Sequence, residues 1–489
     1  MGVPQSRITS LNDKGLNTQG NYVLYWMIAN RRMSHNFSLD RAIELAKAQN
    51  KPLVVLEALR LGYQWASERL HAFILEGMLD NMRDVAGADT DLTYLAYVEK
   101  EIPKGKGLLE HLAKNACAIV TDDFPCFMLP KMTAAAASKV NVKMEMVDSN
   151  GLYPMRIAPQ VFLRAYDFRR HLQKELKPHF DDFPEPAPLE GLKLGQAEVD
   201  TGHWPMMDEV GLEDARSLVK ELDLDHTVKP VDYRGGRQAA LEALSAFKSR
   251  FKRYGEDRNH PDDDVASGLS VWLHFGHIST HEIFRELVPN FKVSQLAAKA
   301  NGARAGWWGM DEHAESFLDE LITWRELGFN MCALRPDDYY KYESLPDWAQ
   351  QTLEEHASDP REWVYSLEEF EKAQTHDDVW NAAQNQLIRE GRIHNYLRML
   401  WGKKILHWSE SPQVALEIMV ELNNKYAVDG RDPNSYSGIF WVLGRYDRAW
   451  GPEREIFGKI RYMTSESAMS KLRMKEYVKR YTARQGSLL

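Results

Sequence analysis

Cysteine, long apolar runs and net positive charge are all scarce in this chain of 489 residues. Its three cysteines are too few and too scattered for a disulfide framework or a zinc site, so a reducing intracellular compartment is expected. No apolar run approaches the about 20 residues that a membrane helix needs, and residues 1–15 lack the apolar core of a signal peptide. We therefore expect a protein without a membrane partner, in the cytoplasm or, in a eukaryote, in the nucleus.

Two phosphate-binding fingerprints are missing as well. No G-x-G-x-x-G follows the first apolar run and no G-x-x-x-x-G-K-[ST] occurs, so an ordinary dinucleotide or nucleotide-hydrolysing site has no support. The formal net charge of −10 argues against a general nucleic-acid coat, so any DNA contact must be a local basic patch. His274, His277 and His281 lie close together, but no carboxylate pattern accompanies them. Core or capping roles are expected for them, and no metal site is predicted.

Short apolar runs alternate with helical stretches in the first third of the chain. The runs lie at residues 22–27, 52–56, 93–98, 118–121 and 143–147. Strands that alternate with helices favour a doubly wound, Rossmann-like parallel sheet. From about residue 212 onward the pattern is helical instead. The predicted organisation is an irregular lead-in, an α/β domain, a proline-rich connector and an all-helical domain, at residues 1–20, 21–150, 151–204 and 205–489.

Tryptophan is abundant, with 14 residues. Trp401 and Trp408 are seven residues apart, which on an α-helix means two turns, one face and a rise of about 10 Å. Trp380 belongs to the preceding helical segment, before the break at Gly391. A tryptophan-rich helical core is one interpretation, because large aromatic side chains dominate core energetics. A site for a flavin or a nucleobase is the other, and the spacing alone leaves both open.

The amino-acid sequence of residues 380–461 is a more specific indication of function than the spacing of the tryptophans. It contains, in order, WNAAQ, KKILHW, LNNKY, DGRDPN, GIFW, DRAW and EREIFGKIRYM. This run resembles the C-terminal flavin domain of class II cyclobutane pyrimidine dimer photolyases, in the photolyase/cryptochrome family. The resemblance implies an N-terminal antenna-type α/β domain and an all-α, FAD-binding catalytic domain. Arg31 and Arg32 lie where the antenna-domain fold begins, and a plain solvated loop is an equal alternative for them.

The activity that the resemblance implies is light-dependent repair of cyclobutane pyrimidine dimers in UV-damaged DNA. A reduced, anionic FAD, excited by light, would pass an electron to a dimer flipped out of the duplex. An antenna chromophore of deazaflavin or folate type is compatible with the family, but its identity is not fixed by the sequence. No obligatory protein partner is implied. The alternative is a cryptochrome-like photosensor that binds flavin without repairing DNA.

Cofactor contacts follow from the resemblance in two groups. Tyr254, Ser267, Leu269 and Ser270 match the phosphate and ribose end, although the Ser-Gly-Leu-Ser stretch alone reads as an N-cap and turn. His277 stands where the family usually has Gln, which is a departure from its pattern. The second group would surround the flavin ring and consists of Arg398, Asn423, Asp429 and Gly430.

The second group has a physical rationale and a plain alternative. A reduced flavin needs a cation nearby, and that cation needs a partner such as Asp429 once both are desolvated. Asn423 would lie beside the flavin N5, where a neutral amide tolerates several redox states. Helix capping by Asn423 and a simple turn at Asp429-Gly430 are the alternatives.

Catalytic residues are also implied by resemblance. Glu320 and Trp324 are four apart, on one face if the segment is an α-helix. They would line the lesion pocket, with Glu320 as a protonated carboxyl, since desolvation raises a carboxyl pKa. A surface Glu beside a core-edge Trp is the alternative. Trp441 would form the second aromatic wall and Met399 a soft floor. Electron transfer would run through Trp401 nearest the flavin, Trp380 in the middle and Trp408 at the exposed end.

The predicted DNA contacts gather toward the C-terminus. Residues 445–484 carry eleven Lys/Arg against five Asp/Glu. By resemblance, Arg448 and Trp450 belong to a loop that fills the hole left by the extruded dimer, and Arg461 contacts phosphate. Arg258 and Asn259 complete the set of predicted DNA contacts. A solvated tail is favoured for residues 471–484, and the loop at Gly444 is one residue shorter than is usual in the family.

Overall fold

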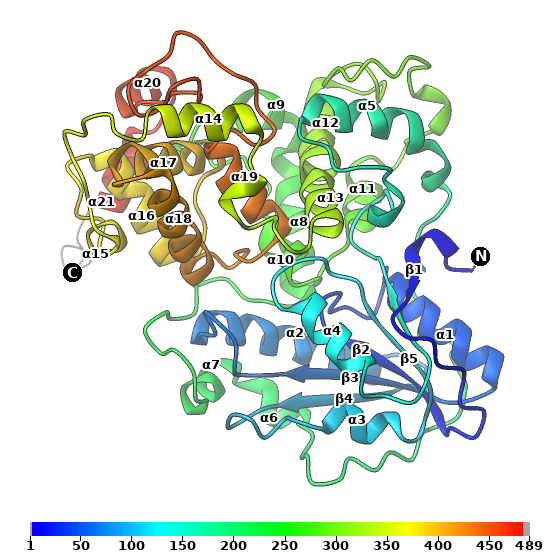
Figure 1. Cartoon of the computed structure of the whole chain (residues 1–489). Coiled ribbons are helices and arrows are strands. Elements are labelled where there is room, and N and C mark those ends of the chain that lie inside the picture. The colour runs from blue at the N-terminus through cyan, green and yellow to red at the C-terminus, as the bar shows by residue number, and fades with distance from the viewer. Residues whose placement is uncertain (1, 483–489) are drawn as a thin grey trace. The chain divides into compact units, whose positions relative to one another are not determined.

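A six-stranded sheet organises the first of two units into which the chain divides. In the computed structural model, which describes residues 2–482, the strand order is β1-β6-β5-β2-β3-β4 (Figure 1). All neighbours but β1 and β6 are parallel, which confirms the predicted doubly wound sheet. The parallel strands are β2 (Tyr22–Met27), β3 (Leu53–Leu59), β4 (Thr93–Val98), β5 (Ala116–Asp122) and β6 (Met144–Val147).

The expectation of an irregular stretch at residues 1–20 is wrong in part. β1 (Ile8–Ser10) pairs antiparallel with β6, at the edge of the sheet. Three residues are too few for an alternating pattern to appear, so the sequence carries no signal for this strand. Just before it, the fully buried Arg7 donates to the backbone carbonyls of Asp148, Gly151 and Leu152 at 3.2, 3.1 and 2.7 Å. These bonds attach the start of the chain to the sheet.

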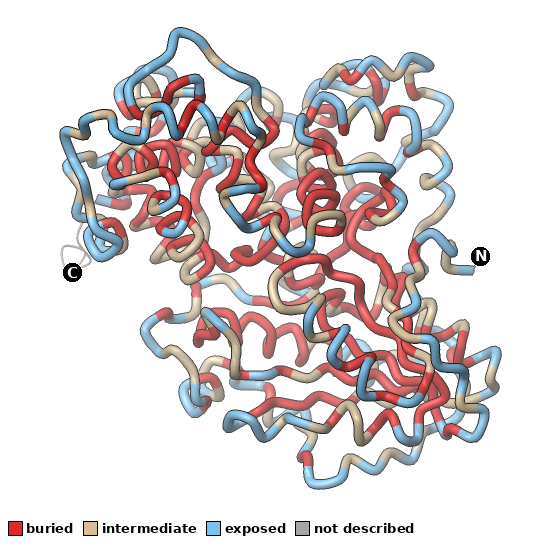
Figure 2. Tube along the Cα trace, viewed as in Figure 1, coloured by how far each residue is buried: buried red, intermediate tan, exposed pale blue. Residues whose placement is uncertain are grey.

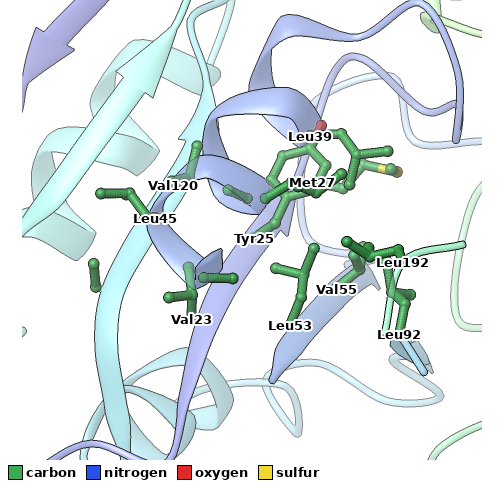
Figure 3. Close-up of a cluster of buried hydrophobic side chains, with 14 of the residues drawn as sticks. Val23, Tyr25, Met27, Leu39, Leu45, Leu53, Val55, Leu92, Val120 and Leu192 are labelled. Atoms are coloured by element: carbon green, nitrogen blue, oxygen red, sulfur yellow. The ribbon is translucent and has the colours of Figure 1, made fainter. Parts of the chain in front are cut away.

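The sheet buries one of its faces against α1 (Phe37–Gln49). Alternate residues of β2 point to this face, as the twofold period of a strand requires, and neighbouring β3 contributes Leu53 and Val55 (Figure 3). Leu39 and Leu45 of α1 pack against them. α2 (Glu68–Gly87), α3 (Leu108–Ala113) and α4 (Leu129–Ala137) are the helices of the remaining crossovers.

Asp122 closes the carboxyl edge of the sheet where β2 and β5 meet. Doubly wound sheets bind ligands at such a switch point. Here the Asp122 carboxylate accepts five hydrogen bonds of 2.8 to 3.2 Å, from the Tyr25 hydroxyl, the backbone N–H groups of Ile28, Ala29 and Asn30, and the Asn30 amide. The N–H groups after β2 are therefore occupied by the protein's own carboxylate.

The arginines after β2 are not a solvated loop. Arg32 is buried and donates from Nη1 to the Gly276 carbonyl at 2.8 Å. Arg31 Nε lies 3.3 Å from Glu57 Oε1, within the same unit. The solvated-loop alternative is therefore wrong for both residues, because each guanidinium finds partners that are distant in the sequence.

The second unit consists of helices and connecting loops and has no strand of the sheet among its described residues. Residues 205–245 and 269–290, predicted to belong to the helical domain, fall in the first unit instead. Unit 2 comprises Pro159–Glu175, Ala246–Gly268 and Phe291–Leu489, and unit 1 comprises Met1–Ala158, Leu176–Ser245 and Leu269–Asn290. This division shares the stretch 151–204, expected as a connector, between both units. Helices after α4 are α5 (Ala165–Glu175), α6 (Glu209–Glu213), α7 (Ala215–Leu218), α8 (Arg237–Arg250), α9 (Tyr254–Asp257), α10 (Ser270–His274), α11 (Thr280–Leu287), α12 (Glu312–Leu318), α13 (Arg325–Leu334), α14 (Asp347–Glu355), α15 (Leu367–Glu371), α16 (Asp378–Glu390), α17 (Asn395–Trp408), α18 (Pro412–Tyr426), α19 (Pro433–Val442), α20 (Ser465–Lys471) and α21 (Lys475–Thr482).

Helix α19 packs closely on two neighbours through glycines. A Cβ at Gly402 of α17 would lie 2.5 Å from Val442 Cγ2, and one at Gly328 of α13 would lie 2.7 Å from Ser437 Oγ. The absence of side chains at these positions lets α13 and α17 approach α19 directly. Figure 2 shows that much of α16 to α19 is buried. Among residues 2–482, no helix is long and apolar enough to cross a membrane.

Candidate active site

Three chain segments bring the predicted flavin-ring residues together in unit 2. Arg398 lies in the first turn of α17, Asn423 lies near the end of α18, and Asp429 follows in the turn before α19. Arg398 Nη2 lies 3.6 Å from Asp429 Oδ2. Gly430 lies so close to α18 that a Cβ there would be 2.9 Å from the Asn423 carbonyl. The four predicted residues thus form one cluster, although their role toward a flavin remains a prediction.

The Asp429 carboxylate in this cluster is incompletely satisfied. Its side chain is 8 % exposed, and Oδ1 has no hydrogen-bond partner among the described residues. Its other oxygen lies 3.6 Å from Arg398 Nη2, a distance longer than a good hydrogen bond. A buried carboxylate in this state normally has a further donor, because an unpaired buried polar atom is costly. The cluster therefore fits a polar group that brings a donor, as the flavin ring does with its ring N–H.

The three predicted electron-transfer tryptophans are neighbours. Trp380 Nε1 donates to the Trp401 carbonyl at 3.0 Å, and the Trp380 and Trp408 ring centroids are 6.3 Å apart. Trp401 Nε1 donates to Gln384 Oε1 at 2.9 Å, which fixes the indole that follows Arg398 by one turn of α17. Trp380 therefore contacts both of the other two residues, and the order of electron transfer stays a prediction.

The expected exposure of Trp408 is wrong. Its side chain is only 2 % exposed, because the segment before α16 folds over it. Tyr365 and His376 cover the indole at centroid distances of 5.8 and 4.8 Å, and Trp363 beyond them is exposed. These aromatic residues were missed because they lie outside the matched motifs.

Glu320 and Trp324 lie on a π-helical turn, not on an α-helix. Residues Asp319–Trp324 adopt i→i+5 bonding between α12 and α13, and such turns are often found at functional sites. Arg169 holds the start of the turn through Asp319, with bonds of 2.7 and 3.0 Å. Both predicted pocket residues are partly exposed. The assumption of α-helical spacing was therefore wrong, since a short sequence does not signal a π-turn.

Glu320 is paired with another predicted site residue. Arg258 Nη1 donates to Glu320 Oε1 at 2.7 Å and to the Tyr254 hydroxyl at 3.4 Å. Burial disfavours the guanidinium charge, but Glu320 and Tyr254 outweigh it and raise the pKa of Arg258 above its usual value. Burial, followed by the Glu320 charge, raises the pKa of Tyr254 to about 12. Glu320 thus accepts a hydrogen bond here, and its predicted role as a donor remains untested.

The predicted phosphate loop contains a tight turn at Gly268. Ser267 belongs to unit 2, whereas Leu269 and Ser270 belong to unit 1. Gly268 has φ of +68°, which a residue with a side chain rarely adopts. Arg392 reaches this loop: its Nη1 would lie 3.9 Å from a Cβ at Gly268, and its Nη2 lies 3.3 Å from Asp264 Oδ2. Arg392 is a cation that the sequence motifs did not single out.

The predicted lesion-pocket residues on α17 and α19 are adjacent. A Cβ at Gly438 would lie 3.8 Å from Met399 Cε and 3.9 Å from Arg398 Cδ. Trp441 follows Gly438 by nearly one turn of α19, and it is partly exposed. Met399, Arg398 and α19 therefore share one contact region, next to the Asp429 cluster.

The loop after α19 has a defined shape despite its short length. Gly444 has φ of +105°, and a Cβ there would lie 2.9 Å from Ala349 and Ile460 side chains. Arg445 is buried, donates to the Tyr339 carbonyl at 2.8 Å and also donates to the Ser344 hydroxyl. The number of basic residues in this region therefore overstates its capacity to bind DNA, because Arg445 is structural.

Trp450, predicted to contact DNA, is partly exposed. Three predicted DNA contacts, Arg448, Arg461 and Asn259, are exposed.

The chain beyond residue 471 is more than a solvated tail. Tyr477 and Tyr481 are buried in the contact of α21 with α16, where the Tyr477 hydroxyl donates to Gln386 Oε1 at 2.7 Å. Arg473 is paired with Asp257 and Asp263, each at 2.7 Å. The favoured interpretation is thus wrong for 471–482, since two tyrosines anchor the helix. Arg484, the last member of the basic stretch, lies outside the described residues.

Neither the histidines of the sequence analysis nor a second cluster found in the structure makes a clear metal site among the described residues. His277 and His281 are fully buried, and burial lowers the pKa of each well below its usual value, as core residues would show. Gly77 leaves space for His277, since a Cβ there would lie 2.3 Å from its Nε2. Glu256, Glu312 and His313 could surround an ion. However, His313 Nδ1 accepts from the Gly255 N–H at 3.1 Å, which leaves the proton of the neutral ring on Nε2.

Comparisons with known proteins cover nearly the whole chain. No family model matches. The chain is 35% identical over 475 residues to "Deoxyribodipyrimidine photo-lyase" of Methanothermobacter thermautotrophicus, covering 97% of each. Proteins of the same name from Arabidopsis thaliana and Potorous tridactylus are 33% and 32% identical, over 93% and 95% of this chain and 88% and 82% of theirs.

Two solved structures share the fold. A bacterial class III photolyase from Agrobacterium tumefaciens gives a TM-score of 0.64 at 16% identity, covering 96% of this chain and 87% of that one. A Synechocystis cryptochrome gives 0.66 at 15% identity, covering 94% and 88%. At such identities these structures speak for the architecture alone.

Proposed function

Because this chain belongs to the deoxyribodipyrimidine photolyase family, as its resemblance to class II members predicted, we propose that it repairs cyclobutane pyrimidine dimers in DNA under light. The observation that carries this proposal is the pair of the partly buried Arg398 and the buried Asp429 beside Asn423, from which three buried indoles lead away. Membership of the family implies a flavin cofactor. An FAD bound at this cluster would supply, once reduced and excited by light, the electron that opens the cyclobutane ring.

The residues around the cluster would hold and tune that cofactor. Arg398 offsets the negative charge of a reduced flavin, and Asp429 holds the guanidinium in place while offering Oδ1 as an acceptor. Asn423 presents a neutral amide, which avoids the repulsion that a second carboxylate would cause. Tyr254, Ser267, Leu269 and Ser270 would contact the phosphate and ribose end, with Arg392 as an added cation near Gly268.

The dimer would lie against the partly exposed face of α19 and the π-turn. Trp441 and Trp324 offer aromatic walls on which pyrimidine rings can stack, and Met399 provides a polarisable floor. Glu320 would turn from Arg258 toward the base edge when a lesion arrives. That exchange frees Arg258 for a DNA phosphate, so one ion pair links lesion contact to backbone contact.

The remaining predicted contacts act on DNA from the exposed side of unit 2. Arg448, Trp450 and Arg461 belong to the segment after α19, and Asn259 follows Arg258. Phosphate contacts of this kind make affinity fall with salt. Extrusion of a dimer costs less than extrusion of a normal pair, because the damage has already weakened stacking. An antenna pigment of deazaflavin or folate type would add light collection, and the protein would act wherever the DNA resides, in cytoplasm or nucleus.

Illumination of the flavin-reduced protein with dimer-containing oligonucleotide tests the proposal. We expect dimers to be restored to pyrimidines under blue light, over many turnovers, with no repair in the dark. Failure to repair with reduced flavin and light would overturn it. A protein that binds flavin and photoreduces it, but repairs nothing, would be a cryptochrome-like photosensor instead.

A further inference from the structure

A row of alternating cations and indoles runs from the interior of unit 2 to its surface. Lys403 Nζ lies 5.1 Å from the Trp441 ring centroid, and Arg461 Cζ lies 5.7 Å from the same centroid. Arg461 Cζ also lies 5.2 Å from the Trp450 ring, and Arg448 Cζ lies 4.5 Å from that ring. We call Lys403, Trp441, Arg461, Trp450 and Arg448 the cation–indole row. Each neighbouring pair is within the range of a cation–π attraction.

The inner end of the row is fixed by helix packing. Gly402 and Val442 bring α17 and α19 into direct contact, and this contact brings Lys403 Nζ to the Val442 carbonyl at 2.6 Å. Lys403 is fully buried. Burial disfavours a charged amine, so a lysine at such a position needs a compensating interaction or a function. Its contacts are with the residue after Trp441 and with the Trp441 ring itself.

The outer end of the row is fixed by one carboxylate. Asp447 Oδ1 accepts from Trp450 Nε1 at 3.1 Å and from the Arg448 backbone N–H at 2.8 Å. Arg448 and Arg461 are exposed, so both can reach solvent and a phosphate while they contact an indole. A displacement of Arg448 or Arg461 by DNA therefore acts on Trp450 and, through Arg461, on Trp441.

We propose that the cation–indole row couples DNA contact to the orientation of Trp441, with Lys403 as the positioning residue at its inner end. This inference rests on the proposed function, in which Trp441 is a wall of the lesion pocket. It assigns to Lys403 a role in distinguishing dimer-containing from undamaged DNA. Lys403 touches neither the DNA nor the cofactor and acts through Trp441.

The coupling depends on pH in the neutral range. Burial lowers the pKa of Lys403 to about 7, while Asp447 opposes this shift and Arg461 adds to it. Below pH 7 the amine is charged and the row is complete. Above pH 7 the neutral amine still donates to Val442, but its attraction to the indole is lost. Preference for dimer-containing DNA should therefore decrease as pH rises through 7.

The variant Lys403→Met tests the proposal through three measurements. At pH 6.5 we expect its affinity for dimer-containing oligonucleotide to fall about tenfold, with flavin content and affinity for undamaged oligonucleotide unchanged. Its affinity should also be flat between pH 6 and 8.5, where that of the wild type falls. Burial of the charged Lys403 amine costs desolvation free energy, and this cost is largest below pH 7. The variant removes it, so below pH 7 the variant should unfold no more easily than the wild type.

Lys425→Met serves as the matched control. Lys425 also lies over an aromatic ring, that of Tyr426 at 5.4 Å, and is paired with Glu371, but it is not a member of the row. Neither the DNA preference nor its pH profile should change in this variant. An equal loss in both lysine variants would overturn the assignment, because the effect would then reflect net charge.

The double variant Lys403→Met/Arg461→Met provides an independent test of coupling. If the row acts as one unit, the second substitution adds nothing further to the loss of dimer preference caused by Arg461→Met alone. Additive losses, or a wild-type preference in Lys403→Met, would overturn the proposal. These outcomes differ from failure of the proposed function, in which the wild-type protein itself neither prefers nor repairs dimer-containing DNA.

Discussion

Two buried aspartates, one in each unit, differ in how their oxygens are used. Asp122, in the sheet unit, is 1% exposed and accepts five hydrogen bonds. Asp429, in the helical unit, is 6% exposed, has one oxygen without a partner among the described residues and faces one arginine at 3.6 Å. Both residues are buried aspartates, but Asp122 uses its oxygens in five hydrogen bonds, whereas Asp429 leaves one oxygen without a partner among the described residues.

The difference separates a structural carboxylate from a binding one. Five donors make Asp122 part of the fold, because they join β2, its following loop and β5. A buried carboxylate with an unused oxygen costs stability unless a ligand completes it. The backbone N–H groups after β2, at the switch point of the sheet, are therefore already bound by the protein's own carboxylate. The carboxylate oxygen that has no partner among the described residues, Asp429 Oδ1, lies among α17, α18 and α19, next to the predicted electron-transfer tryptophans.

The largest effect is expected from Trp380→Phe. This variant tests the helical unit's side of the comparison, because it interrupts the predicted electron-transfer path beside the Asp429 cluster. Phenylalanine is far harder to oxidise than indole, so light-driven reduction of bound oxidised flavin should be abolished. Repair by chemically pre-reduced protein should persist. Flavin absorbance under illumination with an external reductant checks this. Trp26→Phe, at a buried tryptophan of β2, should leave photoreduction intact; undiminished photoreduction in Trp380→Phe would remove Trp380 from the path.

The next effect concerns the fold. Asp122→Ala leaves three buried backbone N–H groups unpaired, and we expect a loss of about 3–5 kcal/mol of stability, measured by urea unfolding. The fraction that still folds should bind flavin normally. Asp208→Ala removes one exposed N-cap bond, to Gly211 at 2.8 Å, and should cost about 1 kcal/mol. Equal losses in the two variants would mean that Asp122 is not the structural carboxylate described above.

A smaller effect is expected from Glu320→Gln, which tests the pairing with Arg258. The neutral amide no longer compensates the guanidinium, so affinity for undamaged DNA at low salt should rise roughly threefold. Repair per photon should fall by a similar factor, since the amide makes a weaker hydrogen bond to the dimer than a charged or protonated carboxyl. Glu312→Gln, which changes the net charge equally at an exposed position of α12, should alter neither quantity. Identical behaviour of the two variants would contradict the specific role of the pair.

Sequence reasoning predicted the parallel strands because their short apolar runs alternate with helical stretches. It also selected residues that the structure brings together, Asn423 and Asp429, since these lie within the motifs LNNKY and DGRDPN, and their role toward a flavin stays a prediction. It could not find β1, whose three residues carry no period, or the π-turn at Asp319–Trp324, whose bonding depends on the helices on either side. Local patterns specify local structure, and these two features depend on distant partners.

Pairings between residues distant in the sequence were the second group of features that could not be predicted from it. Arg258 and Glu320 are 62 positions apart, and both were predicted to contact DNA or lesion, yet they bind each other. Trp408 was expected at the surface, but Tyr365 and His376 cover it. Lys403 lies within the matched motif KKILHW, but the sequence does not show that its amine is buried, because a lysine on a helix is expected on the solvent-exposed face. Only the tertiary contacts show which charges are exposed, paired or buried.

The flavin content of purified Asp429→Asn tests the central claim most directly. We expect this variant to fold as stably as the wild type and to retain flavin at least about tenfold more weakly, because the amide cannot hold Arg398 as the carboxylate does. Wild-type retention of flavin in Asp429→Asn, measured by absorbance after gel filtration, would contradict the assignment of the cofactor site to the cluster of Arg398, Asn423 and Asp429.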